Sequence, residues 1–458
     1  MNKYGRNLIL RLIQSIDAVA IVTLFGICWF AYYADQVYVP FFFWGNWFVI
    51  GLYLFVFLAL GKIYDAFAIS PIRISEMVYG QGLTLIILDA IFFLISCLLA
   101  RKLVSPAAIL LTLLCQTAVV ILWSYGSHRL YCALFPPKRS AVVYDYRKDL
   151  DKVITQYDKN KKFHIQATFT AEECLRDLTC LDGLEVVFFS GVHSRDRNAI
   201  LKYCVSQGIL CYVIPRIGDV IMSGAKQSHL FHLTFFQVGH YSPALSYLAA
   251  KRIFDILFSA AALIVLSPIF LITAIAIKIC DGGPVFYRQN RLTKGGRVFV
   301  MHKFRSMRTD AEKDGIARLS TGNHDTRVTP VGRVIRKLRI DELPQLLDIL
   351  AGNLSIVGPR PERPEIFAQY EQEIPEFRLR LQAKAGLTGY AQVYGQYNST
   401  PYDKLQMDLL YLSNPSLLED LRICFATAKI LFMPESTVGI AEGSTTAVNK
   451  PEADNRNG

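Results

Sequence analysis

Four long apolar stretches lie within the first 130 residues, and they constrain the fold more than any other feature of the sequence. They run over residues 12–33, 41–60, 82–100 and 104–125. A helix needs about 20 apolar residues to cross the hydrocarbon core of a bilayer, and each stretch is about that long. The sequence therefore predicts a transmembrane domain of four helices over residues 1–130.

The composition agrees with a membrane protein. Of the 458 residues, 52% are hydrophobic and only 19% are charged, against about 25% charged residues in soluble domains. This excludes a disordered or purely cytosolic chain. The ten cysteines contain no C-x-x-C pair, so neither a zinc ribbon nor a disulfide framework is expected. The net charge of +11 suits anionic lipid headgroups or phosphorylated substrates as well as nucleic acid, and alone does not choose among them.

Basic residues flank the apolar stretches unequally. Arg101 and Lys102 lie on one side, and a larger set lies on the other: Lys3, Arg6, Arg11, Lys62, Arg73, Arg129, Lys138 and Arg139. The positive-inside rule then places the N-terminus, and the chain after the fourth helix, in the cytoplasm. The first stretch is long and lacks a small-x-small cleavage site, so we interpret it as a spanning helix rather than a signal peptide.

Residues 139–240 change to short β-rich runs separated by polar helical segments. Apolar runs at 141–144, 184–189 and 209–214 are typical of a parallel α/β layer, which predicts a Rossmann-like domain. The first strand is not followed by the glycine-rich turn that a dinucleotide needs. Asp149 and Asp151 match the Asp-x-Asp of many glycosyltransferases, but this spacing is common by chance and we favour the start of an exposed helix.

A fifth apolar stretch, residues 253–279, is interrupted by Ser267 and Pro268. Proline removes a backbone donor and clashes with the preceding turn, so we predict two helical pieces of about 21 and 18 Å, each too short to span a bilayer. A re-entrant hairpin, entering and leaving on the cytoplasmic side, fits better than the alternative of a kinked spanning helix. We expect Lys251, Arg252 and Asp255 at the membrane interface.

The polar region after this stretch has features suited to phosphate chemistry. Asp341 and Glu342 precede an apolar-periodic helix with Pro344 in its first turn, although acids there usually complement the helix dipole. Arg360 lies between two prolines, which presents its guanidinium rigidly for phosphate recognition. Basic residues also crowd between the glycine-rich turns: Arg288, Arg291, Lys294, Arg297, Lys303, Arg305 and Arg308.

From Lys251 to about Val438 the chain resembles the bacterial sugar transferases, which move a sugar 1-phosphate from a nucleotide diphosphate sugar onto polyprenyl phosphate. The first half resembles the long form of this family by layout only. Ala385-Gly386 departs from the Pro-Gly common in relatives. The motifs that carry the resemblance are Lys251-Arg252 with Asp255, Ser267-Pro268, Lys303-Phe304-Arg305-Ser306-Met307, Asp341-Glu342-Leu343-Pro344-Gln345, Pro359-Arg360-Pro361, and Gly386-Leu387-Thr388-Gly389 with Ala391-Gln392.

The resemblance implies a reaction and its residues. Asp341 would attack the sugar-bearing phosphate of a UDP-sugar, release UMP and form a covalent phosphosugar that polyprenyl phosphate then accepts. Arg360, Lys303 and Arg305 would bind substrate phosphates, and Asp341 with Glu342 would hold Mg²⁺. The implied sugar is glucose or galactose, although no residue excludes an N-acetylated sugar. The alternative is a catalytically silent membrane adaptor or regulator of glycan assembly.

The expected organisation is that of a multi-domain protein of the bacterial cytoplasmic (inner) membrane that initiates exopolysaccharide or capsule synthesis. A mainly α catalytic domain over residues 248–438, with its re-entrant hairpin at 253–279, faces the cytoplasm. Residues 440–458 are polar and small enough to predict a disordered tail. The expected partners are the two substrates and membrane lipids, not nucleic acid, and the first half offers surface for a homodimer.

Overall fold

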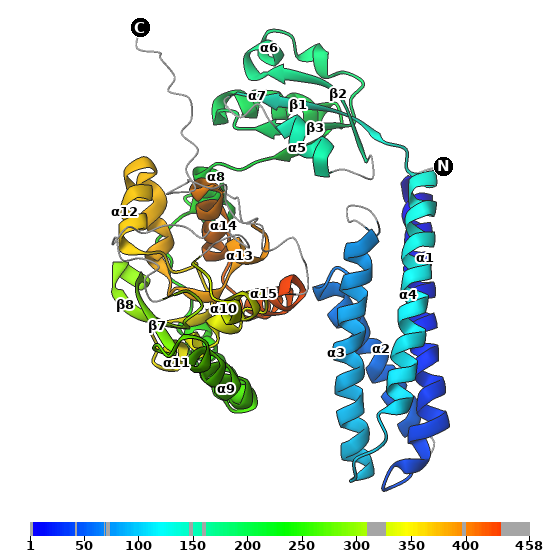
Figure 1. The fold of residues 1–458 in the computed structure, drawn as a ribbon. Coiled ribbons are helices and arrows are strands. Elements are labelled where there is room, and N and C mark those ends of the chain that lie inside the picture. The colour runs from blue at the N-terminus through cyan, green and yellow to red at the C-terminus, as the bar shows by residue number, and fades with distance from the viewer. Residues whose placement is uncertain are drawn as a thin grey trace. The chain divides into compact units, whose positions relative to one another are not determined.

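The computed structural model describes residues 3–41, 44–67, 69, 74–145, 150–157, 162–308, 327–395 and 400–431. The chain forms two compact units, Met1–Ile214 and Pro215–Gly458, whose elements are labelled in Figure 1. The tail predicted at 440–458 lies outside the described residues.

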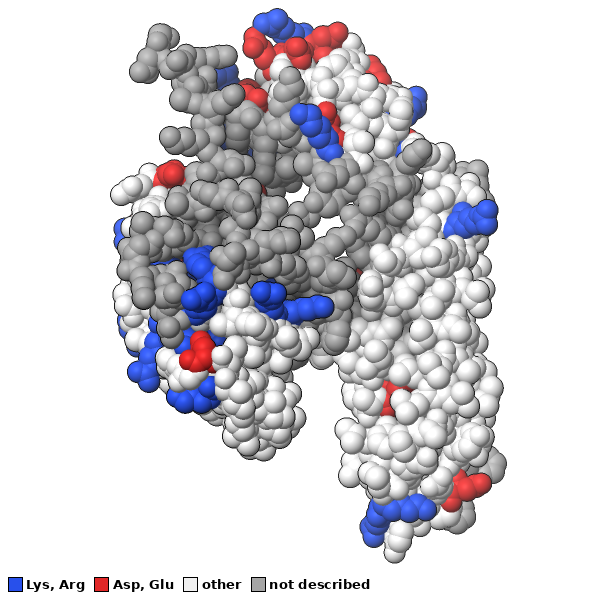
Figure 2. All heavy atoms as spheres, viewed as in Figure 1, with Lys and Arg blue, Asp and Glu red and all other residues white. Residues whose placement is uncertain are grey.

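The first unit begins with long apolar helices that pack side by side (Figure 1). Each is long and apolar enough to cross a membrane, which confirms the apolar pattern read from the sequence. Figure 2 shows that most of the visible surface of this bundle is uncharged. The helices are α1 (Lys3–Cys28), which continues in short helical turns to Gln36, α2 (Gly45–Ile63), α3 (Ile74–Ala100) and α4 (Ala107–Leu134).

Polar side chains pair across the helices of this bundle. Gln81 Nε2 donates to Asp17 Oδ2 at 2.8 Å and so joins α3 to α1. The Tyr53 hydroxyl donates to Asp89 Oδ1 at 2.7 Å, and Gln116 Nε2 donates to the same tyrosine at 3.0 Å. All five side chains are buried. Asp17 and Asp89 therefore connect helices within the bundle.

A parallel sheet follows in the same unit, as the sequence predicted. Its strand order is β2-β1-β3-β4, with every neighbouring pair parallel. The sequence analysis did not identify β2, because it looked for continuous apolar runs. In β2 polar and apolar residues alternate, as in a strand with one solvated face. The elements are β1 (Lys138–Tyr144), α5 (Leu150–Tyr157), β2 (Phe163–Thr170), α6 (Ala171–Arg176), β3 (Val186–Ser190), α7 (Ser194–Ser206) and β4 (Leu210–Val213).

The Asp-x-Asp pair is only partly described. Asp151 lies in the first turn of α5, whereas Asp149 lies outside the described residues. The first turn of a helix favours an acidic residue because of the helix dipole, which accounts for Asp151 without a metal.

The α/β domain ends earlier than the predicted boundary at residue 240. Helix α8 (Ile217–Ser223) shares a hydrophobic core with α14 (Pro401–Ser413) in the second unit. Gln406 donates to the carbonyl of Pro215, and the Tyr241 amide donates to Gln382 Oε1 at 2.8 Å. Between these contacts lies an antiparallel hairpin, β5 (Lys226–Leu230) and β6 (Leu233–Gln237). Residues 215–241 therefore belong structurally to the second unit.

Helix α9 (Leu245–Asp281) is a single helix that runs through Ser267 and Pro268. The predicted division into two helical pieces is therefore not present. In an α-helix the amide of residue 268 would bond the carbonyl of residue 264, and proline cannot make that bond. The Ser267 hydroxyl donates to the Ile264 carbonyl at 2.8 Å instead. This replaces the missing donor and allows the helix to continue.

The rest of the second unit surrounds one main hydrophobic core. Its parallel pair β9–β10 brings Gly358 against Gly386 so closely that a Cβ on Gly386 would lie 2.1 Å from the Gly358 amide nitrogen. The elements are β7 (Phe286–Leu292), β8 (Val298–Phe304), α10 (Pro330–Lys337), α11 (Gln345–Leu350), β9 (Ser355–Val357), α12 (Pro364–Glu373), β10 (Gly386–Thr388), α13 (Tyr390–Val393), α14 and α15 (Leu417–Leu431).

Candidate active site

Asp341 and Glu342 lie in one turn of 3-10 helix, Ile340–Glu342, between α10 and α11. The preceding residue, Arg339, has a φ of 52°, a left-handed conformation that residues other than glycine adopt uncommonly. This conformation separates the acid-bearing turn from α10. The sequence predicted the acids at the head of a helix, and α11 itself begins at Gln345.

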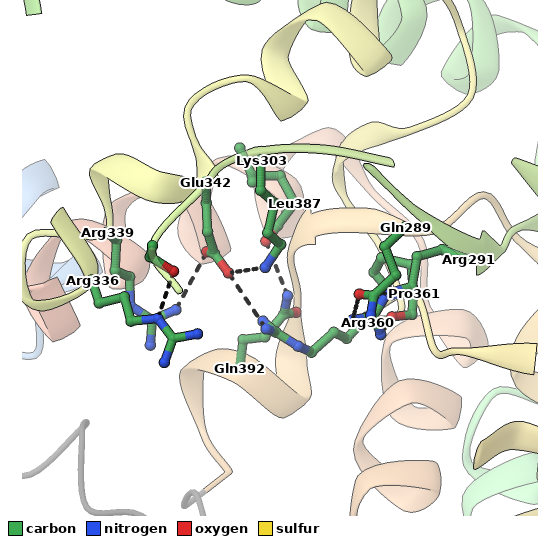
Figure 3. Close-up of polar contacts among 11 residues, drawn as sticks. Gln289, Arg291, Lys303, Arg336, Arg339, Glu342, Arg360, Pro361, Leu387 and Gln392 are labelled. Carbon is green, nitrogen blue, oxygen red and sulfur yellow. Dashed lines mark hydrogen bonds and ion pairs between the residues drawn. The ribbon is translucent and has the colours of Figure 1, made fainter. Parts of the chain in front are cut away.

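Glu342 is surrounded by cationic side chains (Figure 3). Lys303 Nζ lies 3.1 Å and Arg360 Nη2 3.4 Å from Glu342 Oε1, and Arg339 Nη1 lies 3.7 Å from Oε2. Burial acts to raise the pKa of Glu342, but Lys303, Arg360 and Arg339 outweigh it and hold the pKa well below its ordinary value. Glu342 is therefore ionised at neutral pH.

Asp341 has a different environment from its neighbour. It makes no hydrogen bond or ion pair with any residue that the structure describes. Burial, and then repulsion by Glu342, raise the pKa of Asp341 to about 6, although Lys303 and Arg336 oppose the change. At neutral pH Asp341 is thus a carboxylate that is more basic than usual and has uncommitted oxygen atoms, which are the properties of a nucleophile.

The main chain around Arg360 is fixed by two other arginines. Arg380 Nη2 donates to the Arg360 carbonyl at 3.0 Å, and Arg291 Nη1 donates to the Pro361 carbonyl at 3.0 Å. Arg380 is itself only 2% exposed and pairs with Asp408 at 2.6 Å. The Arg360 side chain remains 42% exposed. A rigid main chain therefore presents an accessible guanidinium, which suits phosphate recognition.

These elements enclose one pocket, which we call the acid–cation pocket. Its lining comes from β7, β8, the start of α11, the Pro-Arg-Pro segment, β10 and α13, and from Glu342 of the acid-bearing turn, whereas Asp341 is not among the lining residues. Figure 2 shows lysines and arginines gathered on the visible face of the second unit. The polar residues that line the pocket are Arg291, Lys303, Glu342, Gln345, Arg360 and Gln392.

Arg305, the third cation predicted to bind substrate phosphate, does not contact the acid pair. It is 6% exposed and forms an ion pair with Asp281 at the end of α9, not with either acid of the 3-10 turn. Its amide donates to the carbonyl of Val285 at 2.9 Å. Arg305 follows the end of β8, so it fastens the C-terminal end of α9 to the folded unit.

The three residues expected at the membrane interface fasten the other end of α9. Lys251 Nζ contacts Asp420 Oδ2 at 2.9 Å. Arg252 donates to two main-chain carbonyls at the C-terminal end of α11, at 2.6 and 2.8 Å. Buried Asp255 accepts a bond from the Ile356 amide at 3.0 Å. These charged groups therefore bond to the protein itself.

Two arginines near the acids were not selected from the sequence. Arg336 Nε donates to the Ser306 hydroxyl at 2.8 Å, and both Arg336 and Arg339 lower the pKa of Asp341 against the effect of burial. The left-handed conformation of Arg339 interrupts the helix between them and the acids, so helical spacing gives no signal. Only their nearness in sequence to the acid pair could have identified them.

The acid pair suits a magnesium ion that keeps water and substrate ligands, rather than a metal ion held by protein side chains alone. Within the described residues, no group of three or more His, Cys, Asp or Glu could hold a metal. Mg²⁺ commonly uses only one or two carboxylates and completes its octahedron with water and substrate phosphates. Asp341 and Glu342 supply two neighbouring carboxylates beside phosphate-compatible cations, and this donor set fits that mode.

Sequence comparisons identify the family. Residues 246–434 match the family model described as bacterial sugar transferase. The exopolysaccharide production protein PSS of Rhizobium leguminosarum bv. phaseoli is 40% identical over 189 residues, which cover 39% of this chain and 94% of that protein. The chain therefore belongs to the bacterial sugar transferase family, as its motifs predicted.

Two longer relatives are matched over about half of their length. A UDP-N-acetylgalactosamine-undecaprenyl-phosphate N-acetylgalactosaminephosphotransferase of Aeromonas hydrophila is 39% identical over 234 residues, 50% of this chain and 54% of that protein. A UDP-glucose:undecaprenyl-phosphate glucose-1-phosphate transferase of Xanthomonas campestris pv. campestris is 40% identical over 226 residues, 48% of this chain and 44% of that protein.

Proposed function

We propose that this chain transfers a sugar 1-phosphate from a UDP-sugar to polyprenyl phosphate, with release of UMP, and so initiates exopolysaccharide or capsule synthesis. The observation that carries the proposal is the asymmetry of the acid pair. Glu342 is neutralised by Lys303 and Arg360, whereas Asp341 is an uncommitted carboxylate with a raised pKa. The names of the Aeromonas and Xanthomonas relatives support the same reaction class.

The proposed reaction has two displacement steps at one phosphorus atom. An Asp341 oxygen attacks the sugar-bearing phosphorus, a new P–O bond forms, and the bond to the bridging oxygen breaks as UMP leaves with the electron pair. A phosphate oxygen of polyprenyl phosphate then attacks the same phosphorus, and Asp341 leaves as a carboxylate. Lys303 and Arg360 offset the repulsion between the anions. A Mg²⁺ held by Asp341 and Glu342 would neutralise further charge on the diphosphate.

The proposed sugar is a hexose, glucose or galactose. The glucose-1-phosphate transferase from Xanthomonas supports this choice, and the relative from Aeromonas is named for N-acetylgalactosamine instead. A panel of radiolabelled UDP-sugars, offered with polyprenyl phosphate to the purified full chain, decides the identity. Transfer from UDP-glucose or UDP-galactose is expected, and transfer confined to N-acetylated sugars would contradict the choice.

The nucleotide released by the same preparation tests the reaction class. UMP is expected, and without lipid acceptor the protein itself should become labelled by the sugar. Release of UDP would instead indicate an ordinary glycosyltransferase that uses Asp149 and Asp151, and failure to release any nucleotide would favour the adaptor. Asp151→Asn is the matched control, because it removes an acid of the rival site and should leave UMP release unchanged.

We also propose that α9 is re-entrant, with both of its ends on the cytoplasmic side. A straight helix of its 37 residues would be about 55 Å long. Yet Asp255 bonds Ile356 near its start, and Asp281 pairs with Arg305 at its end. Re-entrance of this continuous helix requires a bend, which we place at Pro268 because helices kink at proline. Contact of both ends with one folded unit supports it, because a single crossing puts the ends on opposite sides of the bilayer.

Cysteine labelling tests this arrangement. The native Cys280 is exposed near the end of α9, and Leu245, at its start, is also exposed. Two full-length variants would each keep one thiol, Cys280 or a Leu245→Cys replacement, in a chain otherwise free of cysteine. A membrane-impermeant maleimide should label both thiols only from the cytoplasmic side. Labelling of Cys280 only from the opposite side would indicate a fifth spanning helix.

A further inference from the structure

The side-chain oxygen Oε1 of Gln392, a residue that lines the acid–cation pocket, has no role in the mechanism proposed above. Gln392 lies in α13, just after the turn that follows β10, and lines the pocket with Lys303, Glu342 and Arg360 (Figure 3). Its Nε2 donates to the Leu387 carbonyl at 3.0 Å. Its Oε1 is buried and has no hydrogen-bond partner among the described residues.

The orientation of this carboxamide is fixed by its surroundings. Turning the amide over would place Oε1 against the Leu387 carbonyl, and two acceptors cannot bond each other. The space beside Oε1 is also limited, because a Cβ on Gly389 would lie 2.8 Å from that atom. The main-chain amide of Gln392 donates to the Gly389 carbonyl at 3.0 Å. The side-chain Nε2 already donates to the Leu387 carbonyl through one of its two N–H groups, and Oε1 is the acceptor that no described residue satisfies.

A phosphate oxygen cannot satisfy this acceptor, because it is an acceptor too. The complement must carry an O–H or N–H group. Lys303 and Arg360 are the cations suited to the phosphates, so the donor must lie on a part of the substrate that is close to a phosphate but not part of it. On a nucleotide sugar, the donor fewest bonds away from the reacting phosphorus is the group on C2 of the sugar, a hydroxyl in hexoses and an amide N–H in N-acetylated sugars.

We propose that Gln392 is a specificity residue whose Oε1 accepts a hydrogen bond from the C2 substituent of the transferred sugar. This inference rests on the proposed function for the identity of the substrate. A buried acceptor that the substrate alone satisfies rejects an analogue lacking the donor, because that analogue leaves the acceptor unpaired. The residue thus recognises a feature that hexoses and N-acetylated hexoses share, and it weakens the binding of 2-deoxy sugars.

The experiment is a binding cycle with UDP-glucose and UDP-2-deoxyglucose on the full chain carrying Asp341→Asn, which cannot form the covalent phosphosugar. This parent chain should bind UDP-glucose about tenfold more tightly than the analogue, as expected for one buried hydrogen bond. Adding Gln392→Met, which keeps the side-chain length, should make the binding of both nucleotides equal. Adding Gln392→Asn, which keeps an amide but not its reach, should lose the same preference. Equal binding of both nucleotides by the parent chain, or a preference that survives with Gln392→Met, would overturn the proposal.

Gln382 provides the matched control. Its Nε2 also donates to a main-chain carbonyl, that of Leu379, at 2.9 Å, but its Oε1 already accepts from the Tyr241 amide. Gln382→Met should lower the melting temperature and keep the preference for UDP-glucose. Because binding does not require turnover, failure of UMP release would count against the proposed function, whereas loss of the C2 preference counts only against Gln392. If Gln392→Met instead abolished a preference for UDP-glucose over its 2′-deoxyribose analogue, Oε1 would be assigned to the ribose and the proposal would be overturned.

Discussion

The acids of the helix bundle and the acid pair of the second unit have different partners. In the helix bundle Asp17 contacts the amide of Gln81 and Asp89 contacts the phenol of Tyr53, and no lysine or arginine of the described chain forms an ion pair with either. In the acid–cation pocket Glu342 contacts three cations. An acid among neutral partners at bilayer depth suits an uncharged, helix-connecting role, whereas cations maintain the anion that phosphate chemistry requires. Cationic partners alone do not mark a reactive site, because buried Asp408 and Asp420 also pair with cations, Arg380 and Lys251, in contacts that hold the second unit together.

The largest expected effect follows removal of charge at Asp341. Asp341→Asn keeps the shape of the side chain but not the nucleophile, so phosphosugar transfer should fall by about 10³-fold or more. The melting temperature should change little, because Asp341 makes no described hydrogen bond or ion pair. Transfer assays and thermal unfolding of the purified chain measure both. A covalent sugar label that persists on Asp341→Asn protein would show that another group is the nucleophile.

A smaller effect is expected from Lys303→Met. It leaves Glu342 with one cation fewer and removes a charge from the pocket, so transfer should fall by about 10²-fold and stability by about 1–3 kcal/mol. Arg305→Met is the control from the same segment, because Arg305 pairs with Asp281 and should affect stability more than transfer. An equal loss of transfer in Arg305→Met at unchanged stability would make Arg305 a phosphate ligand.

The pH dependence of transfer should report Asp341. Its pKa is raised to about 6, so the reactive carboxylate is present above that pH and is lost as the pH falls through it. Between pH 7 and pH 5, kcat/KM should fall about tenfold. Repulsion by Glu342 contributes to the raised pKa, so Glu342→Gln should move the midpoint to lower pH. A midpoint that does not move would assign the titration to another group.

The smallest effects are expected in the bundle. Asp17→Asn and Asp89→Asn keep an acceptor oxygen without a charge, so each should change the free energy of unfolding by less than about 0.5 kcal/mol. Asp89→Leu removes the acceptor of the Tyr53 hydroxyl and should cost about 1–3 kcal/mol. Thermal unfolding in detergent measures these changes. If the asparagine variants lost transfer while remaining folded, the bundle acids would need their charge.

Local patterns predicted much of this molecule. The length of the apolar stretches predicted the bundle, and continuous apolar runs predicted three strands of the parallel sheet. Motif residues also identified the acid pair with Lys303 and Arg360. What failed depended on partners distant in the sequence or on replaced hydrogen bonds. Pro268 alone indicates a broken helix, because the sequence does not show that the Ser267 hydroxyl takes over the Ile264 carbonyl.

Arg305 shows that the sequence also does not reveal which acid a basic residue pairs with. Its sequence context is as basic as that of Lys303, and only the fold reveals that Asp281 neutralises it. The boundary near Pro215 was likewise invisible, because it depends on the packing of α8 against α14, about 180 residues later. Residue type is readable from a sequence, whereas the choice of partner is not.

The attachment of α9 has a consequence for how the bilayer itself influences the reaction. Arg252 bonds the end of α11, which follows Asp341, and Asp255 bonds β9, which precedes Arg360. If α9 is re-entrant as proposed, the depth at which it lies among the acyl chains would set the height of the Asp341 carboxylate above them. Bilayers of different thickness shift such a helix, so the length of the acyl chains would then change the rate of the proposed transfer.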